Sequence, residues 1–337
     1  MADGALLVQM LSELPSEGVE FAFSYGSGAI SQLHSQDPRA NMVDFLLVVS
    51  NALEYHERNL YLNRNHYSAI RLFGAGFLAR FQRKYGAGAY FNTMIRSRKC
   101  DGRLYKYGIV ANDEAVADLL DWDCLYLSGR LQKPVVPIRE AEAGSELARA
   151  VATNRKSAVH TALLLLPESF SAAELFQTIA SLSYDGDLRQ YFGEDKHKIS
   201  NIVRAQTPLF HQLYDPILTQ MQQVHVTGEK VLQDSSPAAV HHHLELLPKA
   251  VLLRIQEQWS GRGEQQQRGG QYWDLEEMVF RLAYATDYQT RLRAATSSIV
   301  RRSSSTQTLK NALTAGVTKS LIYSARKLLK MARSLMR

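Results

Sequence analysis

The feature that most constrains the fold is a nearly continuous apolar segment, Met42 to Val49, interrupted by one carboxylate, Asp44. A run of this kind is typical of a strand that is buried on both faces of a sheet. A carboxylate inside such a strand is costly to bury unless it is paired or binds a cation. The segment therefore predicts a central strand, and Asp44 predicts either a metal-binding carboxylate or an Asp that caps a neighbouring loop.

Alternating strand and helix patterns surround this segment, and a mainly helical pattern begins near residue 143. A capping box, Ser171 with Glu174, opens one of the later helices. The pattern predicts an α+β chain built on a mixed sheet and followed by a mainly helical part. The elements expected before residue 143 are strands at Val19 to Tyr25, Met42 to Val49, Ala87 to Arg96 and Arg103 to Val110, and helices at Ala52 to Asn63 and Ser68 to Tyr85.

A turn of small residues, Gly26-Ser27-Gly28, directly follows the first strand. Backbone N–H groups and a hydroxyl in such a turn can converge on phosphate oxygens, although the same residues also form ordinary tight loops. Together with Asp44 on the next strand, the turn matches the arrangement of the nucleotidyltransferase superfamily, in which the carboxylate holds Mg²⁺ against nucleotide phosphates. The usual second acid is missing, because Leu46 occupies its position. The second metal ligand is left open among Asp101, Asp113, Asp118, substrate phosphates and water.

Several further motifs resemble, in order and spacing, the mitochondrial CDP-diacylglycerol synthases of the Tam41 type, which are phosphatidate cytidylyltransferases. The resemblance runs from about residue 20 to the C-terminus, and its most specific part is the Gly-Arg-Leu-Gln-Lys-Pro-Val segment that begins at Gly129. The motifs are His56-x-x-Asn59-Leu60-x-x-Asn63-x-x-His66-Tyr67-Ser68, Tyr85-Gly86-Ala87-Gly88-Ala89-Tyr90, Lys106-Tyr107-Gly108, Ser128-Gly129-Arg130-Leu131-Gln132-Lys133-Pro134-Val135, Ser183-Tyr184-x-Gly186-Asp187-x-Arg189 and Gly193-Glu194-Asp195-x-x-Lys198.

The resemblance implies a nucleotidyltransferase domain over residues 1–142, a helical, winged-helix-like domain over residues 143–300, and a basic tail over residues 301–337. It implies transfer of a cytidylyl group from CTP to phosphatidic acid, which gives CDP-diacylglycerol and pyrophosphate for phosphatidylglycerol and cardiolipin synthesis. The implied location is the matrix side of the mitochondrial inner membrane, as a peripheral protein. Location rests on the resemblance alone, because residues 1–20 are acidic and contain neither Lys nor Arg, unlike a transit peptide.

The residues suggest a division of roles in that reaction. Mg²⁺ on Asp44 would bridge the CTP phosphates, and the Gly26-Ser27-Gly28 turn would cradle the leaving pyrophosphate. Lys106, Arg130 and Lys133 are expected to neutralise the remaining phosphate charge, although each residue type is also common as ordinary surface charge. The lipid phosphate is already anionic at neutral pH, so no strong general base is required.

Polar residues near the second strand are expected to contact the nucleotide or substrate. They are His56, Asn59, Asn63, His66 and Tyr67. For the two histidines, a metal or acid/base role competes with simple hydrogen bonding in or near the site. The run His241-His242-His243 is predicted to be a solvated loop without function, since no Cys or carboxylate partners it at a spacing suited to zinc.

Positive charge is concentrated at the C-terminus. No acidic residue follows Asp287, whereas eleven of the 39 basic residues do, leaving 28 against 33 acidic residues in the preceding chain. Residues 317–337 form an amphipathic pattern suited to an anionic membrane surface, with a helix packed on the core or a calmodulin-like segment as the alternatives. The residues expected to meet the membrane include Lys319, Leu321, Arg326, Leu328, Lys330 and Arg333.

Two other function classes remain open on the sequence. A winged-helix-like domain with a basic tail can bind nucleic acid, but the cations gather on one amphipathic helix and no RNP1-like motif is present, so no nucleic acid is expected. A nucleotidyltransferase with a non-lipid acceptor is the second alternative. The two cysteines, Cys100 and Cys124, form no CxxC pair, which disfavours structural zinc and disulfides. The longest apolar runs fall far short of the ~20 residues that a membrane-spanning helix needs.

Overall fold

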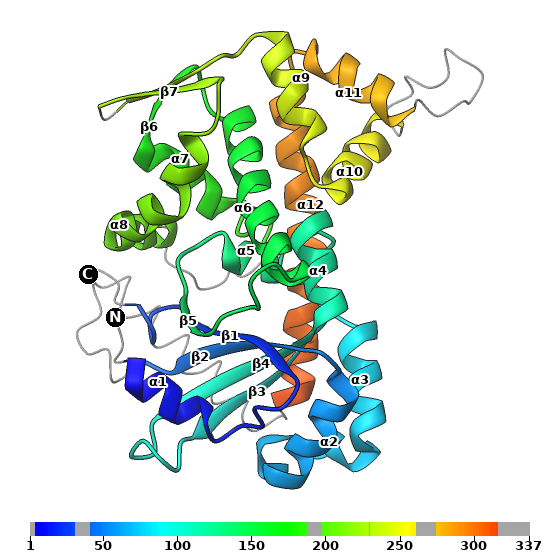
Figure 1. Ribbon diagram of the computed structural model, residues 1–337. Coiled ribbons are helices and arrows are strands. Elements are labelled where there is room, and N and C mark those ends of the chain that lie inside the picture. Colours follow the sequence, from blue (N-terminus) through cyan, green and yellow to red (C-terminus); the bar gives the residue numbers. More distant parts are fainter. Residues whose placement is uncertain (1–3, 31–40, 188–196, 229, 261–273, 316–337) are drawn as a thin grey trace.

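A five-stranded mixed sheet forms the lower half of the molecule in the computed structural model, which describes residues 4–30, 41–187, 197–228, 230–260 and 274–315 (Figure 1). Its order is β3-β4-β2-β1-β5, and β2 pairs with β4 in parallel while the other neighbours are antiparallel. The predicted α+β class and mixed sheet are confirmed. The strands are β1 (Val19–Tyr25), β2 (Val43–Val49), β3 (Ala89–Arg96), β4 (Leu104–Ala111) and β5 (Val136–Arg139).

The side chains of β2 alternate between two apolar layers. Val43, Phe45 and Leu47 pack toward α1 (Gly4–Leu11) and α2 (Ala52–Leu62), whereas Leu46 and Val48 pack toward α4 (Asn112–Asp121) and α5 (Leu127–Leu131). Because side chains alternate along a strand, Asp44 belongs to the second layer with Leu46. The interpretation of β2 as a strand covered on both faces is confirmed.

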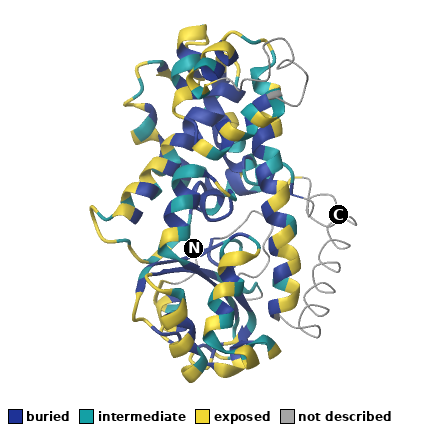
Figure 2. Cartoon of the chain, turned by 90° about the vertical axis from the view of Figure 1, so that its right-hand side faces the viewer, coloured by how far each residue is buried: buried dark blue, intermediate teal, exposed yellow. Residues whose placement is uncertain are grey.

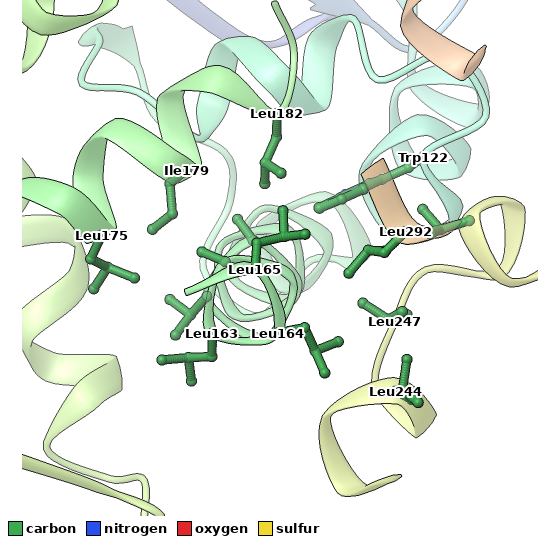
Figure 3. Close-up of a cluster of buried hydrophobic side chains, with 14 of the residues drawn as sticks. Trp122, Leu163, Leu164, Leu165, Leu175, Ile179, Leu182, Leu244, Leu247 and Leu292 are labelled. Carbon is green, nitrogen blue, oxygen red and sulfur yellow. The ribbon is translucent and has the colours of Figure 1, made fainter. Parts of the chain in front are cut away.

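Helices and a small three-stranded sheet make up the other half of the molecule. The core is centred on α6, where Leu163, Leu164 and Leu165 spread toward Ile179 on one side and Leu292 on the other (Figure 3). Buried residues gather in the sheet and where helices meet, and the outward faces of the helices are exposed (Figure 2). The elements are α6 (Glu146–Leu165), β6 (Ser169–Ser171), α7 (Ala172–Ser181), α8 (Lys198–Leu218), β7 (Val224–Thr227), β8 (Lys230–Gln233), α9 (Pro237–Glu245), α10 (Lys249–Ser260), α11 (Leu275–Ala283) and α12 (Tyr288–Ala315), with the small sheet in the order β6-β8-β7.

At three places the local structure confirms or corrects the sequence prediction. The expected Ser171–Glu174 capping box is present at the start of α7. The segment from Ser68 to Tyr85 is not one helix: a 3-10 turn (Ala69–Phe73) precedes α3 (Gly74–Lys84), because Gly74 adopts a φ of +79° that interrupts helical geometry. The predicted loop at His241-His242-His243 is wrong, since these residues lie within α9, whose N-terminus Ser236 caps.

The last described helix, α12, joins the two halves of the molecule (Figure 1). Its first part buries apolar residues such as Leu292 and Ile299, and its second part buries polar ones, including Gln307 and Lys310. The amide of Gln307 accepts from Ala87 N at 2.8 Å and donates to Ala89 O at 3.1 Å. The Lys310 amine donates to the carbonyls of Gln82 and Tyr85 at the end of α3. The predicted boundary at residue 300 falls within this helix.

We expect Gln307→Ala to lower the free energy of unfolding by about 2 to 4 kcal/mol, because it leaves two buried backbone groups of the β3 edge without partners. The matched control is Leu309→Ala on the same helix, whose side chain is exposed and should cost no more than about 0.5 kcal/mol. Urea denaturation followed by circular dichroism measures both. Equal midpoints for the two variants would contradict the joining role of α12.

Among the described residues, no helix combines the length and the apolar character needed to cross a bilayer.

Candidate active site

Asp44 lies at the beginning of β2, with Tyr25 and Lys106 as its partners on the two neighbouring strands. Its side chain keeps 25% of its surface exposed, and one carboxylate oxygen lies 4.0 Å from Lys106 Nζ. Lys106 Nζ is also 4.1 Å from the centre of the Phe91 ring, which is a cation–π distance. The sheet therefore holds a carboxylate and an ammonium group side by side, at the edge of the buried layer that contains Leu46.

The Gly26-Ser27-Gly28 turn closes over the same place. Gly26 has a φ of +75°, and a Cβ atom at this position would lie 3.7 Å from Asp44 Oδ2. The Gly26 carbonyl accepts from the N–H groups of Ala29 and Ile30 at 3.1 and 3.0 Å, which fixes the turn. Gly28 lies flat against the backbone of Met42, where no side chain would fit. Both glycines are therefore required by the geometry that brings the turn to Asp44.

Arg130 reaches this site from α5. Its guanidinium carbon lies 4.8 Å from the centre of the Tyr25 ring and 5.7 Å from that of Tyr126. Stacking of a guanidinium on aromatic rings fixes its plane and leaves its N–H groups available for an anion.

The loop that carries α5 is organised by Asp118. The buried carboxylate of Asp118 accepts from the N–H groups of Cys124, Tyr126 and Ser128 at 3.0 to 3.2 Å, and from the Ser128 hydroxyl at 3.1 Å. Leu125 in this loop has a φ of +50°, an uncommon conformation for a residue with a branched side chain. We infer that Asp118 positions Tyr126 and, through α5, Arg130.

The remaining cations are Lys133, in the segment between α5 and β5, and Lys198, at the start of α8 in the helical half. Lys133 is buried and donates to Gly129 O and, at 2.7 Å, to Ser183 Oγ. Its amine lies 5.2 Å from the centre of the Tyr184 ring, and the amine of Lys198 in α8 lies 4.8 Å from the same ring. We call Lys106, Arg130, Lys133 and Lys198 the cation group.

The electrostatics of this site favour a bound anion. Burial raises the pKa of Asp44, an effect that the positive charges of Lys106, Arg130 and Lys198 oppose. Burial also lowers the pKa of Lys133 well below its usual range, and repulsion from Arg130 and Lys198 lowers it further. Among the described residues, every charge that acts on Asp44 is a cation. A polyanion such as a nucleoside triphosphate would neutralise these cations. A divalent ion could then be shared between its phosphates and the Asp44 carboxylate.

The polar residues that were expected to contact substrate lie on the opposite face of the sheet. Asn59 Nδ2 lies 2.8 Å from the hydroxyls of both Tyr67 and Tyr107. Tyr107 follows Lys106 on β4, so its side chain points away from the cation group. The other contacts of this buried network are His56 with Tyr67 and Gln82, Asn63 with Asn59, and His66 with Tyr107.

His56 is fully buried in that network. Burial lowers its pKa to about 4, so its imidazole is neutral at physiological pH. The structure does not bring His56, Asn59, Asn63, His66 or Tyr67 together with Asp44. Their hydrogen bonds instead join α2 and the following turn to β4.

The three carboxylates considered as a second metal ligand lie in different surroundings. The oxygens of Asp118 are engaged by the α5 loop. Asp113 forms an ion pair with Arg83 just beyond the other end of β4, and Asp101 lies exposed in the turn before β4 with a φ of +48°. None of the three is among the groups that shift the pKa of Asp44.

Comparison with known proteins identifies the family of the chain. The model of the family described as "Phosphatidate cytidylyltransferase, mitochondrial" matches residues 7–330, a range that includes Asp44 and the whole cation group. The chain belongs to this family. A relative from Caenorhabditis elegans with that name is 41% identical over 327 residues, which cover 97% of this chain and 98% of the relative. Relatives of the same name from Xenopus laevis and Drosophila melanogaster are 40% and 38% identical, and cover 98% and 94% of this chain and 95% and 96% of their own.

Family membership accounts for the sequence motifs, whereas the structure adds residues to which the sequence assigned no role. Lys198 and Tyr184 lie in two of the motifs that carry the resemblance, and that was the only signal for them. Asp118 was considered only as a metal ligand, because its hydrogen bonds depend on a loop conformation that residue spacing does not reveal.

Proposed function

We propose that this chain is an enzyme that transfers a cytidylyl group from CTP to phosphatidic acid, giving CDP-diacylglycerol and pyrophosphate. The observation that carries the proposal is the family match over residues 7–330. The cation group around Asp44 supports it, because the reaction brings together two phosphate-bearing substrates that repel one another.

The proposed fold assignment is more specific than the α+β class. We take residues 1–142 as a nucleotidyltransferase-like domain and residues 143–300 as a winged-helix-like domain. Residues 301–315 complete α12 and pack on the first domain, so we place the tail after Ala315. The first assignment is supported by the order strand, Gly-Ser-Gly turn, strand with Asp44. The second is supported by the small β6-β8-β7 sheet among the helices α6 to α9.

The chemistry follows from the residues around Asp44. An oxygen of the lipid phosphate attacks the α-phosphorus of CTP, and the bond from that phosphorus to the bridging oxygen of the β-phosphate breaks, so that pyrophosphate leaves. The attacking phosphate is already anionic, so the protein must align the groups and neutralise their charge rather than remove a proton. The Gly26-Ser27-Gly28 turn and Lys106 would hold the phosphates nearest β2. Arg130, Lys133 and Lys198 would neutralise the remaining charge from the side of the helical half.

The site fits Mg²⁺ as a cofactor. Mg²⁺ is usually held through one or two protein carboxylates together with substrate phosphates and water. Asp44 offers a partly exposed carboxylate, and Gly26 places no side chain beside Oδ2. When bound, Mg²⁺ would supply positive charge that stabilises the leaving pyrophosphate.

We further propose that the protein works as a peripheral protein on the matrix side of the mitochondrial inner membrane. The curated relatives are named as mitochondrial. The predicted amphipathic helix over residues 317–337 lies outside the described residues, so its support is the pattern of cations and apolar residues in the sequence. An acceptor that remains in the bilayer gives the enzyme a reason to stay at its surface.

The proposal is tested by incubating the purified chain with radiolabelled CTP, Mg²⁺ and vesicles that contain phosphatidic acid. We expect labelled CDP-diacylglycerol from the intact chain. A chain that ends at Ala315 should lose at least about tenfold on vesicles and retain its activity on detergent-dispersed phosphatidic acid. Absence of lipid product from the intact chain in both forms of the substrate would overturn the proposal, and equal activity of the two chains on vesicles would overturn the role of the tail.

Asp118→Asn should lower kcat by about 10- to 100-fold, the range seen when an outer hydrogen-bond partner of a site residue is lost. An amide offers one accepting oxygen where the carboxylate offers two, so at least one of the N–H groups of Cys124, Tyr126 and Ser128 loses its partner. Asp121→Asn, which makes the same chemical change at the last residue of α4, is the control and should change kcat by less than about twofold. If both variants match the wild type in steady-state assays, Asp118 does not position α5.

A further inference from the structure

Three histidines converge in the helical half, away from the cation group. His160 projects from α6, and His242 and His243 project from α9. One side-chain nitrogen from each residue lies within 4.8 Å of those of the other two. The closest pair is His160 Nδ1 and His243 Nδ1, 2.9 Å apart. In Figure 1, α9 stands at the top of the molecule and the five-stranded sheet at the bottom.

The protonation of these rings suits a metal ligand rather than an ion pair. Burial, together with repulsion between the rings, lowers the pKa of His160 to about 3, and burial lowers that of His243 to about 4. Both rings are therefore neutral at physiological pH, and each offers a nitrogen lone pair. Neutral imidazole is a common ligand for zinc and other divalent transition metals.

Within the described residues, not every buried ring nitrogen of this histidine cluster has a hydrogen-bond partner. The contact between His160 and His243 uses one nitrogen of each ring. His243 is only 2% exposed, and its Nε2 has no hydrogen-bond partner there. A buried polar nitrogen without a partner is costly, so packing alone gives no reason for a polar cluster at the contact between α6 and α9. Apolar neighbours such as Val159 and Leu244 fill the surrounding core.

We propose that His160, His242 and His243 form a three-histidine site for a divalent transition metal ion of the zinc class, linking α6 to α9. Zinc–nitrogen bonds of about 2.0 to 2.1 Å place tetrahedral ligand atoms about 3.3 Å apart, so the present spacing requires only small side-chain adjustments. His242 is partly exposed and gives the ion a path from solvent, and a water molecule would supply the fourth ligand. The site differs in kind from the one at Asp44, where the ligand is an oxygen suited to Mg²⁺.

The run His241-His242-His243 has no Cys or carboxylate partner at a spacing suited to zinc, and the structure instead places a third histidine beside it. The missing ligand is His160, which lies more than eighty residues earlier in the chain and meets His243 only through the packing of α6 on α9. His241 belongs to the same run but pairs with Glu245 at 3.5 Å, outside the cluster. It therefore provides a matched control.

The test is a titration of the untagged, chelator-treated chain with Zn²⁺ and with Co²⁺, using the Asp44→Asn variant in parallel so that metal at the carboxylate site is not counted. We expect one tightly bound ion per chain, tetrahedral Co²⁺ absorption, and a rise in melting temperature of about 5 to 10 °C at a hundredfold excess of free metal over Kd. His160→Gln and His243→Gln should abolish all three effects, whereas His241→Gln should retain them.

The His242→Gln variant separates loss of metal binding from loss of folding. Because His242 is partly exposed, this variant should keep the metal-free melting temperature of the wild type and lose tight metal binding. Equal binding by the wild type and His242→Gln, or no binding by the wild type, would overturn the proposal. Neither result would bear on cytidylyl transfer, because the proposal does not depend on it.

Discussion

Asp44→Asn is expected to lower cytidylyl transfer by at least about 10³-fold, the largest effect of any single substitution considered for this protein. The amide keeps the shape of the side chain but removes the charge that would hold Mg²⁺ beside Lys106 and the Gly26 turn. Because burial raises the pKa of Asp44, a neutral amide is easier to bury here than the carboxylate. Stability in the absence of ligands should therefore not fall.

The measurement combines the lipid-product assay over a range of Mg²⁺ concentrations with urea denaturation of each variant. Asp113→Asn is the matched control, since it makes the same chemical change at an exposed carboxylate paired with Arg83. We expect Asp113→Asn to retain activity within about twofold. If Asp44→Asn kept more than a tenth of the wild-type rate at saturating Mg²⁺, the carboxylate would not be the metal ligand.

The central strand was the part of the fold that the sequence predicted best. Only burial on both faces explains the apolar run from Met42 to Val49, so the position of Asp44 within the sheet followed directly. The assembly of Lys106, Arg130 and Lys133 into one group of cations could not be predicted in the same way. They come from β4, from α5 and from the residues that follow it, and no local pattern states that these segments meet. Family motifs singled them out, and tertiary packing brings them together.

The polar network around Tyr107 illustrates why the sequence could not predict on which face of the sheet these polar residues lie. His56, Asn59 and Asn63 lie on α2 or at its end at helical spacing, which identifies a common side of the helix but not the side of the sheet against which it packs. Lys106 and Tyr107 are adjacent in sequence and point to opposite faces of β4. The face of the sheet can be assigned only when it is known against which side of the sheet α2 packs.

The burial of the second half of α12 is likewise not visible in the sequence pattern. Hydrophobic periodicity ends near Val300, yet burial continues through Gln307 and Lys310 because their partners are backbone groups at the ends of β3 and α3. In the sequence alone, a polar helix face that packs against backbone groups cannot be distinguished from a solvent-exposed helix face. The boundary at residue 300, which the family resemblance implied, therefore falls within a continuous helix.

Arg130→Lys is expected to lower kcat/KM for CTP by about 10²-fold although it preserves the positive charge. The guanidinium of Arg130 lies at cation–π distance from the rings of Tyr25 and Tyr126, and these contacts would fix the plane in which its N–H groups meet the proposed phosphate. A lysine ammonium is a more flexible point charge that cannot donate two parallel hydrogen bonds to one phosphate. The matched control is Arg149→Lys on the exposed side of α6, which should leave kcat/KM unchanged.

Adding Arg130→Met to the same assays shows whether the positive charge of Arg130 or the geometry of its guanidinium determines kcat/KM. If geometry matters most, Arg130→Lys should resemble Arg130→Met more closely than the wild type, and the loss should persist as ionic strength is raised. If Arg130→Lys were nearly as active as the wild type while Arg130→Met was inactive, Arg130 would act as a simple positive charge. The stacking on Tyr25 would then serve to pack α5 on the sheet rather than to align the phosphates of CTP.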